Sequence, residues 1–199
     1  MRVLEVFVVA TFVACALPAA AQSGVQTQRL MATTIPLEAP PTSSPIAAIW
    51  QDRLAAEQRK LAALSVTPPN SYQPPSDISV NAFAASFKDG DRTIILSALF
   101  TTPECTNLSG AAAPNLNNCP MRIAVLENGQ IKVVLSEGDF PFVAALKDTA
   151  NDKVNEFDNQ TSRDKTLVMF NPATHEITTA LTLNGVPDAE KAAPIRIAY

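Results

Sequence analysis

Two mainly apolar segments between Met121 and Ser136 flank Asn128-Gly129. Asn-Gly favours a type I′ turn, because that turn requires a positive φ at both of its central residues. The pattern therefore predicts a β-hairpin over 121–136, in a register that sets Ile123 opposite Val134. Apolar residues fall on both faces of this hairpin, which is typical of an interior pair of strands covered on two sides.

A second hairpin is predicted immediately before the first one. The segments 79–87 and 92–100 are rich in apolar residues, and the turn signal Asp89-Gly90 lies between them. The register implied by a turn on these two residues sets Phe83 opposite Leu96. That register brings the apolar faces of the two strands together, which supports the pairing.

The last third of the chain predicts a third hairpin and a terminal strand. The segments 165–170 and 175–183 flank the turn-forming residues 171–174, and residues 194–199 alternate like a strand. Three hairpins and one terminal strand amount to about seven strands, antiparallel because their connections are short. We therefore expect a mainly β (α+β) fold, either a small antiparallel β-sandwich or a curved sheet, with one N-terminal amphipathic helix.

Residues 139–164 are compatible with two structures. Phe142, Leu146 and Val154 would suit one face of a helix, although Asn151 and its polar neighbours are poor helix formers. The segment 140–146 would equally suit a strand that precedes an acidic loop. The pattern does not choose between these two structures.

An amphipathic helix followed by a Pro-rich linker is predicted over 43–76. Ser43-Ser44-Pro45 is typical of a helix start, because serine is a good N-cap and proline fits the first helical position. Large apolar side chains form a stripe along this helix: Ile46, Ile49, Trp50, Leu54, Leu61 and Leu64. An isolated helix of this length is marginal in water, so the stripe must be buried against another surface. We expect it to dock on an outer face of the sheet with Trp50 as the anchor; a partner chain is the alternative acceptor.

The first 21 residues have the pattern of a secretory signal peptide. Arg2 precedes an apolar run too short for an ordinary membrane-spanning helix, and Ala19-Ala20-Ala21 supplies the small residues that precede a cleavage site. We expect cleavage before Gln22 and a periplasmic or secreted protein. No second long apolar segment follows, so the mature chain is expected to lack a transmembrane segment.

A lipid anchor is the alternative to simple cleavage. Phe12-Val13-Ala14-Cys15 resembles a bacterial lipobox only loosely, and processing there would leave the protein anchored through Cys15. Residues 22–42 are polar and rich in proline, so they are predicted to be a flexible leader or tether.

Two cysteines remain after the signal segment is removed, Cys105 and Cys119. An even pair in an exported chain predicts a disulfide bond. In the chain-entropy model, closing a loop of about 15 residues is worth about 3 kcal/mol. We therefore expect residues 77–199 to form a disulfide-stapled β domain.

The charge of the chain argues against nucleic acid as a partner. The formal net charge is −4 at pH 7, and the sequence has no cluster of lysine and arginine that would bind phosphates. Nucleic acid is therefore not an expected partner. A partner protein or a component of the cell envelope is expected instead.

Candidate catalytic and metal-binding groups are few. His175 is the only histidine, it follows a turn, and no Gly-x-Ser-x-Gly sequence accompanies it. Glu137 and Asp139 are close together in sequence, and the acidic residues of 148–164 would offer oxygen ligands to calcium without the spacing of an EF-hand. We assign no catalytic residue, metal or cofactor from these patterns.

The leading hypothesis is a non-enzymatic exported domain that binds a protein or an envelope component. A hydrolase that uses Asp/Glu chemistry in a cleft of the sheet is the first alternative, and it requires two convergent, desolvated carboxylates. An envelope-assembly subunit, in which the N-terminal helix pairs between chains, is the second alternative.

Overall fold

The computed structural model confirms the predicted fold class: the chain is mostly β, with two antiparallel sheets and one long helix. The structure describes residues 24–65, 78–101, 104–108, 116–143, 165–183, 186–187 and 194–199. The predicted signal segment 1–21, Cys15, most of the linker within 43–76 and the acidic segment 148–164 lie outside the described residues. Among the described residues, no helix has the length and apolar character needed to cross a bilayer.

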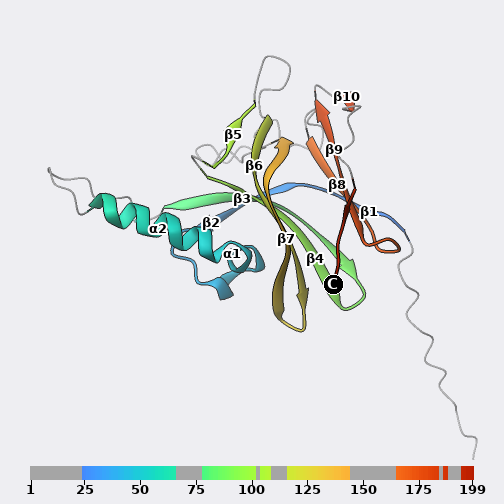
Figure 1. Ribbon diagram of the computed structural model, residues 1–199, viewed down its shortest axis with the longest axis horizontal. Helices are drawn as coiled ribbons and strands as arrows, with labels where there is room; N and C mark the ends of the chain where they lie inside the picture. Colours follow the sequence, from blue (N-terminus) through green and yellow to red (C-terminus); the bar gives the residue numbers. More distant parts are fainter. Residues whose placement is uncertain are drawn as a thin grey trace, which may run out of the picture.

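The larger sheet has the strand order β2-β3-β4-β6-β5, and β7 pairs with β6 (Figure 1). Its strands are β2 (Met31–Pro36), β3 (Ser79–Asp89), β4 (Arg92–Phe100), β5 (Thr106–Asn107), β6 (Leu116–Glu127) and β7 (Gln130–Val143). The smaller sheet has the order β1-β8-β9-β10, and β11 also pairs with β9. Its strands are β1 (Gln26–Arg29), β8 (Lys165–Asn171), β9 (Glu176–Leu183), β10 (Val186–Pro187) and β11 (Ile195–Arg196).

The segment predicted to be a flexible leader is structured instead. Residues 26–29 pair with β8 and residues 31–36 pair with β3, so one extended segment passes from the smaller sheet to the larger. Leu30 lies at the crossing, where it is buried and its N–H donates to the carbonyl of Thr166 at 2.9 Å. These long-range pairings stabilise a segment that has little apolar periodicity of its own.

Glutamine side chains continue the hydrogen bonding where this segment leaves the larger sheet. The Gln26 amide donates to the carbonyl of Lys88 at 2.6 Å and accepts from the Lys88 N–H at 3.1 Å. Gln28 accepts from the N–H of Ser86 at 3.0 Å. Part of the β3 edge is thus satisfied by side-chain amides that replace a neighbouring strand.

The central hairpin predicted over 121–136 is confirmed as part of β6 and β7. Asn128 and Gly129 have φ values of 51° and 75°, the positive values that a type I′ turn needs. The predicted pairing of Ile123 with Val134 is wrong, because a register shift sets Ile123 opposite Leu135. Val134 is the extra residue of a β-bulge in this strand.

The β3–β4 hairpin forms, but its predicted register is wrong by two residues. Phe83 lies opposite Ala98, because Asp89 pairs with Arg92 and the turn is therefore centred on Gly90-Asp91. Gly90 has a φ of 59°, which suits glycine at the first central position of such a turn. A shift of two residues leaves each side chain on its face, so the apolar faces still coincide.

The remaining strands follow the third predicted hairpin. Strands β8 and β9 pair as predicted, and the terminal strand is only the short β11, which pairs with the start of β9. In the segment left open between two structures, residues 140–143 continue β7 as a strand. The rest of that segment, 144–164, lies outside the described residues.

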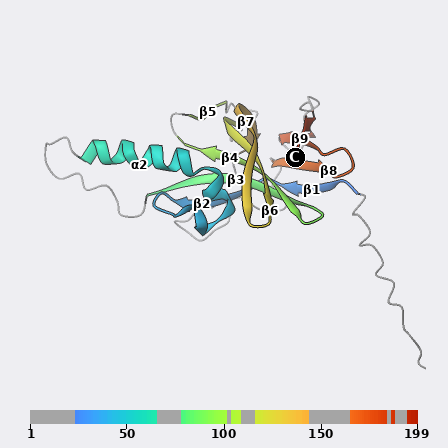
Figure 2. The same ribbon diagram turned by 60° about the horizontal axis from the view of Figure 1, so that its bottom comes forward.

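The larger sheet is buried on both faces, as the pattern of its central hairpin predicts. One apolar cluster lies between the two sheets and contains Phe83, Phe87, Phe142 and Phe170. The other lies between the larger sheet and the helices and contains Trp50, Leu54, Ile95 and Leu99. In Figure 2 the helices lie at the left and the smaller sheet at the right, with strands of the larger sheet between them.

The predicted N-terminal helix is two helices rather than one. A short 3₁₀ turn (η1, Pro41–Ser43) precedes α1 (Pro45–Ile49), and α2 (Gln51–Ser65) follows. Ser44 is the N-cap of α1, because its Oγ accepts from the N–H of Ala47 at 3.0 Å. The break falls at Trp50, whose backbone leaves the helical region at φ −108° and ψ 11°.

Candidate ligand groove beside helix α2

Trp50 fastens the helices to the larger sheet. Its side chain is 1% exposed, and its indole N–H donates to the Oγ of Ser97 on β4 at 2.9 Å. Ser97 is itself fully buried within an apolar strand. A buried indole N–H that has a partner avoids the free-energy cost of an unpaired donor, so this bond fixes where Trp50 can sit.

Arg122 on β6 also contacts Trp50 and the residues on either side of it. Its guanidinium lies 4.5 Å from the centre of the Trp50 ring and donates two hydrogen bonds to Asp52, at 2.6 and 2.8 Å. It also donates to the carbonyl of Ile49 at 2.6 Å. That carbonyl is turned toward Arg122 instead of continuing the helix, which accounts for the break between α1 and α2.

Sequence reasoning identified Trp50 but missed both of its partners. Ser97 and Arg122 are polar residues inside otherwise apolar strands, at positions 94–100 and 121–126. A polar side chain in such a run must find a partner when it is buried. That signal would have marked both residues as parts of a buried contact.

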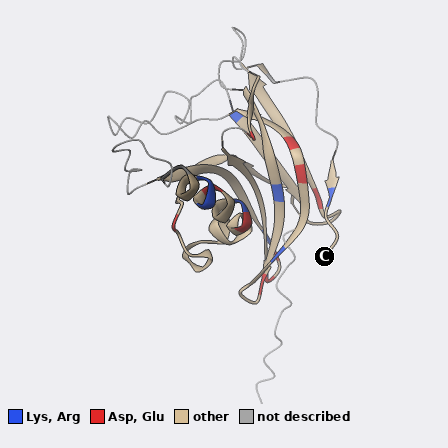
Figure 3. Ribbon diagram, turned by 60° about the vertical axis from the view of Figure 1, so that its left-hand side comes forward, with Lys and Arg blue, Asp and Glu red and all other residues tan. Residues whose placement is uncertain are grey.

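The predicted docking stripe is only partly buried. Ile49, Trp50 and Leu54 are almost completely buried, whereas Ile46 and Leu61 are half-buried at the margin of the cluster. The side chain of Leu64 lies outside the described residues. Beyond its first turn, α2 exposes the basic residues Arg59 and Lys60, whereas Glu57 is half-buried. Figure 3 shows charged residues of both signs along the helices.

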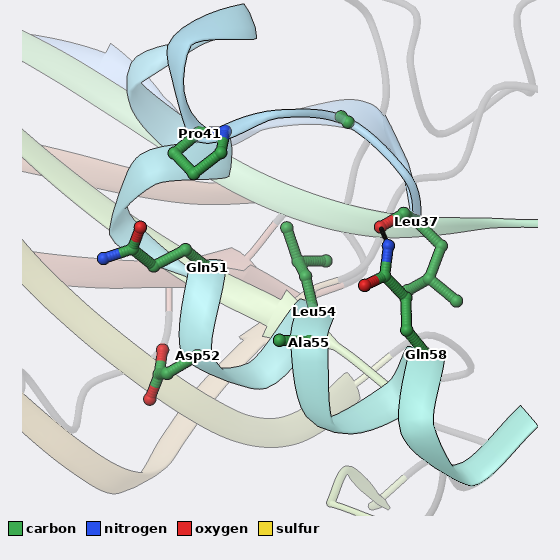
Figure 4. Close-up of a pocket in the computed structure, with 8 residues that line it drawn as sticks. Leu37, Pro41, Gln51, Asp52, Leu54, Ala55 and Gln58 are labelled. Carbon is green, nitrogen blue, oxygen red and sulfur yellow. Dashed lines mark hydrogen bonds between the residues drawn. The ribbon is translucent and has the colours of Figure 1, made fainter. Parts of the chain in front are cut away.

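A groove of about 430 Å³ lies between the start of α2 and the segment that follows β2 (Figure 4). Its lining is mainly apolar, with two amides and one carboxylate: Leu37, Ala39, Pro41, Gln51, Asp52, Leu54, Ala55 and Gln58. The sequence did not predict this groove. Residues 37–41, which form one of its walls, fall in the segment predicted to be a flexible leader.

The wall formed by residues 37–41 is tied to both the sheet and the helix. Leu37 is buried, and its N–H donates to the carbonyl of Ile78 at 2.8 Å. The amide of Gln58 on α2 donates to the carbonyl of Leu37 at 2.5 Å, which holds the two walls together. Ala39 closes a tight turn by donating to the carbonyl of Pro36 at 2.9 Å.

Asp52 is the one charged residue that lines the groove. The hydrogen bonds from Arg122 are the main reason that the pKa of Asp52 lies below its usual value. The carboxylate is therefore ionised near neutral pH, and 58% of the side chain is exposed to solvent. The groove therefore has an acidic end and an apolar floor.

A second cluster of polar side chains joins the two sheets away from the groove. Tyr199 donates its hydroxyl to Asp89, and its ring stacks on His175 at 4.9 Å between centres. The Nε2 atom of His175 lies 3.6 Å from the same Asp89 carboxylate. The guanidinium of Arg92 lies 5.0 Å from the centre of the Tyr199 ring. Burial, reinforced by the hydrogen bond to Asp89, raises the pKa of the Tyr199 hydroxyl.

The other candidate groups do not line the groove. Glu137 and Asp139 occupy exposed positions on β7, and Asp139 accepts from the amide of Asn118 at 2.9 Å. Exposure on an edge strand differs from the convergent, desolvated pair that a carboxylate-based hydrolase needs. Across the described residues, no three acidic, histidine or cysteine side chains gather as a metal site.

The sulfurs of Cys105 and Cys119 lie 2.09 Å apart, at the distance of a disulfide bond. Cys119 is fully buried in β6, and Cys105 lies in the segment that leads into β5. The pair therefore ties β5 and the chain before it to the core of the larger sheet. Neither cysteine lines the groove.

No known protein family, curated protein or solved structure matches this chain.

Proposed function

We propose that this chain is an exported, non-enzymatic domain that binds an extended segment of a partner protein in the groove beside α2. The carrying observation is the groove itself, whose walls are fixed by Trp50, Arg122 and Gln58 before any ligand arrives. Its volume of about 430 Å³ falls in the range of sites that hold small ligands or single side chains. A pre-formed site reduces the entropy lost on binding.

The chemistry of the lining indicates the kind of ligand. Leu37, Leu54 and Ala55 offer an apolar floor for one large apolar side chain. Gln51 and Gln58 are seven residues apart on one helix, so they are separated by about 10.5 Å along its axis. Three residues of an extended peptide span about 10 Å, which matches that separation.

Glutamine amides suit a peptide backbone because each one can donate and accept at once. The chain already contains such a contact, in which the Gln26 amide pairs with both the N–H and the carbonyl of Lys88. Gln51 is exposed, and Gln58 keeps its carbonyl oxygen while its amide nitrogen bonds Leu37. Recognition of this kind reads the main chain and one apolar side chain, and so tolerates varied sequences.

A selection from a displayed random peptide library tests this function, followed by anisotropy measurements on the selected peptides. Ala55→Arg fills the groove and should weaken binding at least about tenfold, equivalent to about 1.4 kcal/mol. Ala63→Arg makes the same substitution on an exposed position of α2 outside the groove and should leave binding unchanged. Equal binding by the two variants, or no enrichment over a bare surface, would contradict the proposal.

Export is a separate part of the proposal. It is supported by the Ala19-Ala20-Ala21 sequence and by the cysteine pair at disulfide distance, since such bonds persist in oxidising compartments. Mass spectrometry of the protein from its own host should find Gln22 as the first residue. A lipid-modified Cys15 would replace a periplasmic or secreted protein with an anchored one.

A further inference from the structure

The outer edge of β7 has backbone groups that point away from its neighbour β6. Glu127 and Gln130 flank the two-residue turn and face each other as a hydrogen-bonded pair. Backbone groups in an antiparallel pair alternate between the two edges of a strand, so those of Ile131 and Val133 point outward. At the far end of the strand, beyond a second register shift, the N–H of Val143 also points outward and donates to the Oγ1 of Thr166 at 2.9 Å.

The β-bulge changes the alternation along this edge. Because Val134 is an extra residue, Leu135 faces Ile123 directly, and the next outward groups fall on Ser136. A second register shift follows Glu137, between the pairs Met121–Glu137 and Cys119–Phe140, and interrupts the alternation there. In the described part of the chain, the outward groups of Ile131, Val133 and Ser136 make no hydrogen bond. Val133 is also one of the exposed large apolar residues, with 41% of its surface accessible.

We propose that two copies of this chain pair along β7, antiparallel and related by a two-fold axis. With that axis between Val134 and Leu135, Val133 of each copy lies opposite Ser136 of the other. The two-fold axis repeats this pair. Both of its residues have outward backbone groups, so each copy of the pair can exchange two hydrogen bonds. The bulge is what makes this symmetric register possible, because it places outward groups on both sides of the axis.

Charge complementarity supports a second copy as the occupant. In the same register, Lys132 of each copy lies directly opposite Glu137 of the other, and the two-fold axis repeats that pair. Both side chains are exposed in the single chain, and no ion pair within the described residues includes either one. A lysine on an edge strand ordinarily opposes pairing with another edge. Glu137 of the other copy neutralises this lysine across the edge, so the charge favours pairing in this register.

Sedimentation equilibrium of the purified full chain over a range of concentrations tests the pairing. The wild type should pass from monomer to dimer, whereas Lys132→Glu and Glu137→Lys should each raise the dissociation constant at least about tenfold. A mixture of the two variants should recover the wild-type constant, because each mixed dimer contains two opposite-charge pairs. Arg59→Glu makes the same change of charge on an exposed position of α2 and should have no effect.

Val133→Pro gives a second, charge-independent variant. Proline removes the outward N–H without removing a bond to β6, and proline is tolerated at such edge positions. It should abolish dimer formation while the circular dichroism spectrum and the unfolding midpoint stay close to those of the wild type. A wild type that stays monomeric up to about 1 mM, or a mixture of charge variants that stays dissociated, would overturn the proposal.

Discussion

At the scale of single residues, the junction between helix and sheet depends on very few side chains. Trp50 supplies the buried surface, Ser97 accepts its N–H, and Arg122 covers its ring and binds Asp52. The importance of Trp50 was predictable from its place on an apolar stripe. Polar residues inside apolar strands mark Ser97 and Arg122 as buried contacts, but their pairing with Trp50 was not predictable, because their strands are far from the helix in sequence.

Replacing Ser97 with alanine leaves the indole N–H of Trp50 buried without an acceptor. We expect the free energy of unfolding to fall by about 1–3 kcal/mol, the usual effect of an unpaired buried donor. Urea denaturation followed by circular dichroism measures this value. Ser86→Ala is the matched control, since the Ser86 side chain is exposed on β3, and it should change stability by less than about 0.5 kcal/mol.

Asp52 makes the same junction sensitive to acid. Its pKa is lowered in the folded chain, so its contribution to stability is complete above the ordinary aspartate value of about 3.9. That contribution is lost as the pH falls through the lower, folded value. The difference in unfolding free energy between wild type and Asp52→Asn should therefore shrink on acidification below about pH 4. A difference that is constant from neutral to acid pH would contradict the ion pair with Arg122.

Tyr199 makes the contact between the two sheets sensitive to alkaline pH. Its pKa is raised by burial and by the Asp89 carboxylate, so the stability it contributes is present below the ordinary tyrosine value, near pH 10. It is lost as the pH rises through the higher, folded value. In a Tyr72→Phe background, which leaves Tyr199 as the single tyrosine, phenolate absorbance should appear at higher pH in the folded chain than in urea.

Two substitutions separate the causes of that shift. Asp89→Asn removes a negative charge beside the Tyr199 hydroxyl and should bring the titration back toward the unfolded curve. Asp91→Asn removes the same charge from an exposed position in the adjoining turn and should leave the titration unchanged. Titration at the same pH in folded and unfolded protein would refute the contact.

At the scale of elements, local turn chemistry was predictable and long-range pairing was not. The Asn128-Gly129 turn follows from residues that accept positive φ, so its position is correct. The two-residue shift in β3–β4 reflects a choice between two local turns, because Gly90 takes the first central position instead of the second. The bulge at Val134 has no turn residue that marks it in the sequence. Strands β1 and β2 escaped prediction because they pair with strands distant in sequence, and the wall of the groove that follows β2 escaped with them.

The Asn128-Gly129 turn gives a test at this scale. Alanine in place of Gly129 must adopt a φ of 75°, which costs an L-residue about 1–2 kcal/mol, while its added Cβ meets no atom within 4 Å. The unfolding free energy should fall by that amount, as measured in urea. Gly24→Ala is the control, because Gly24 has open space and no left-handed backbone, and it should leave stability within about 0.5 kcal/mol of wild type.

At the scale of the whole molecule, two layers cover the larger sheet, the smaller sheet on one face and the helices on the other. The apolar faces predicted from the sequence are sufficient to specify this β-rich, two-sheet body. The groove required more, because it forms only where a segment after β2 meets a helix that has docked on the sheet. The proposed binding function therefore depends on that docking in the single, folded chain.

Trp50 fluorescence tests this dependence directly, because Trp50 is the only tryptophan. In dilute, monomeric protein its emission should be blue-shifted, as for a buried indole, and it should resist quenching by iodide. On urea denaturation the emission should shift to the red in the same transition that removes the circular dichroism of the sheets. A solvent-exposed emission spectrum in the folded monomer would contradict the account, because the helix would then be undocked and the groove would lose one of its walls.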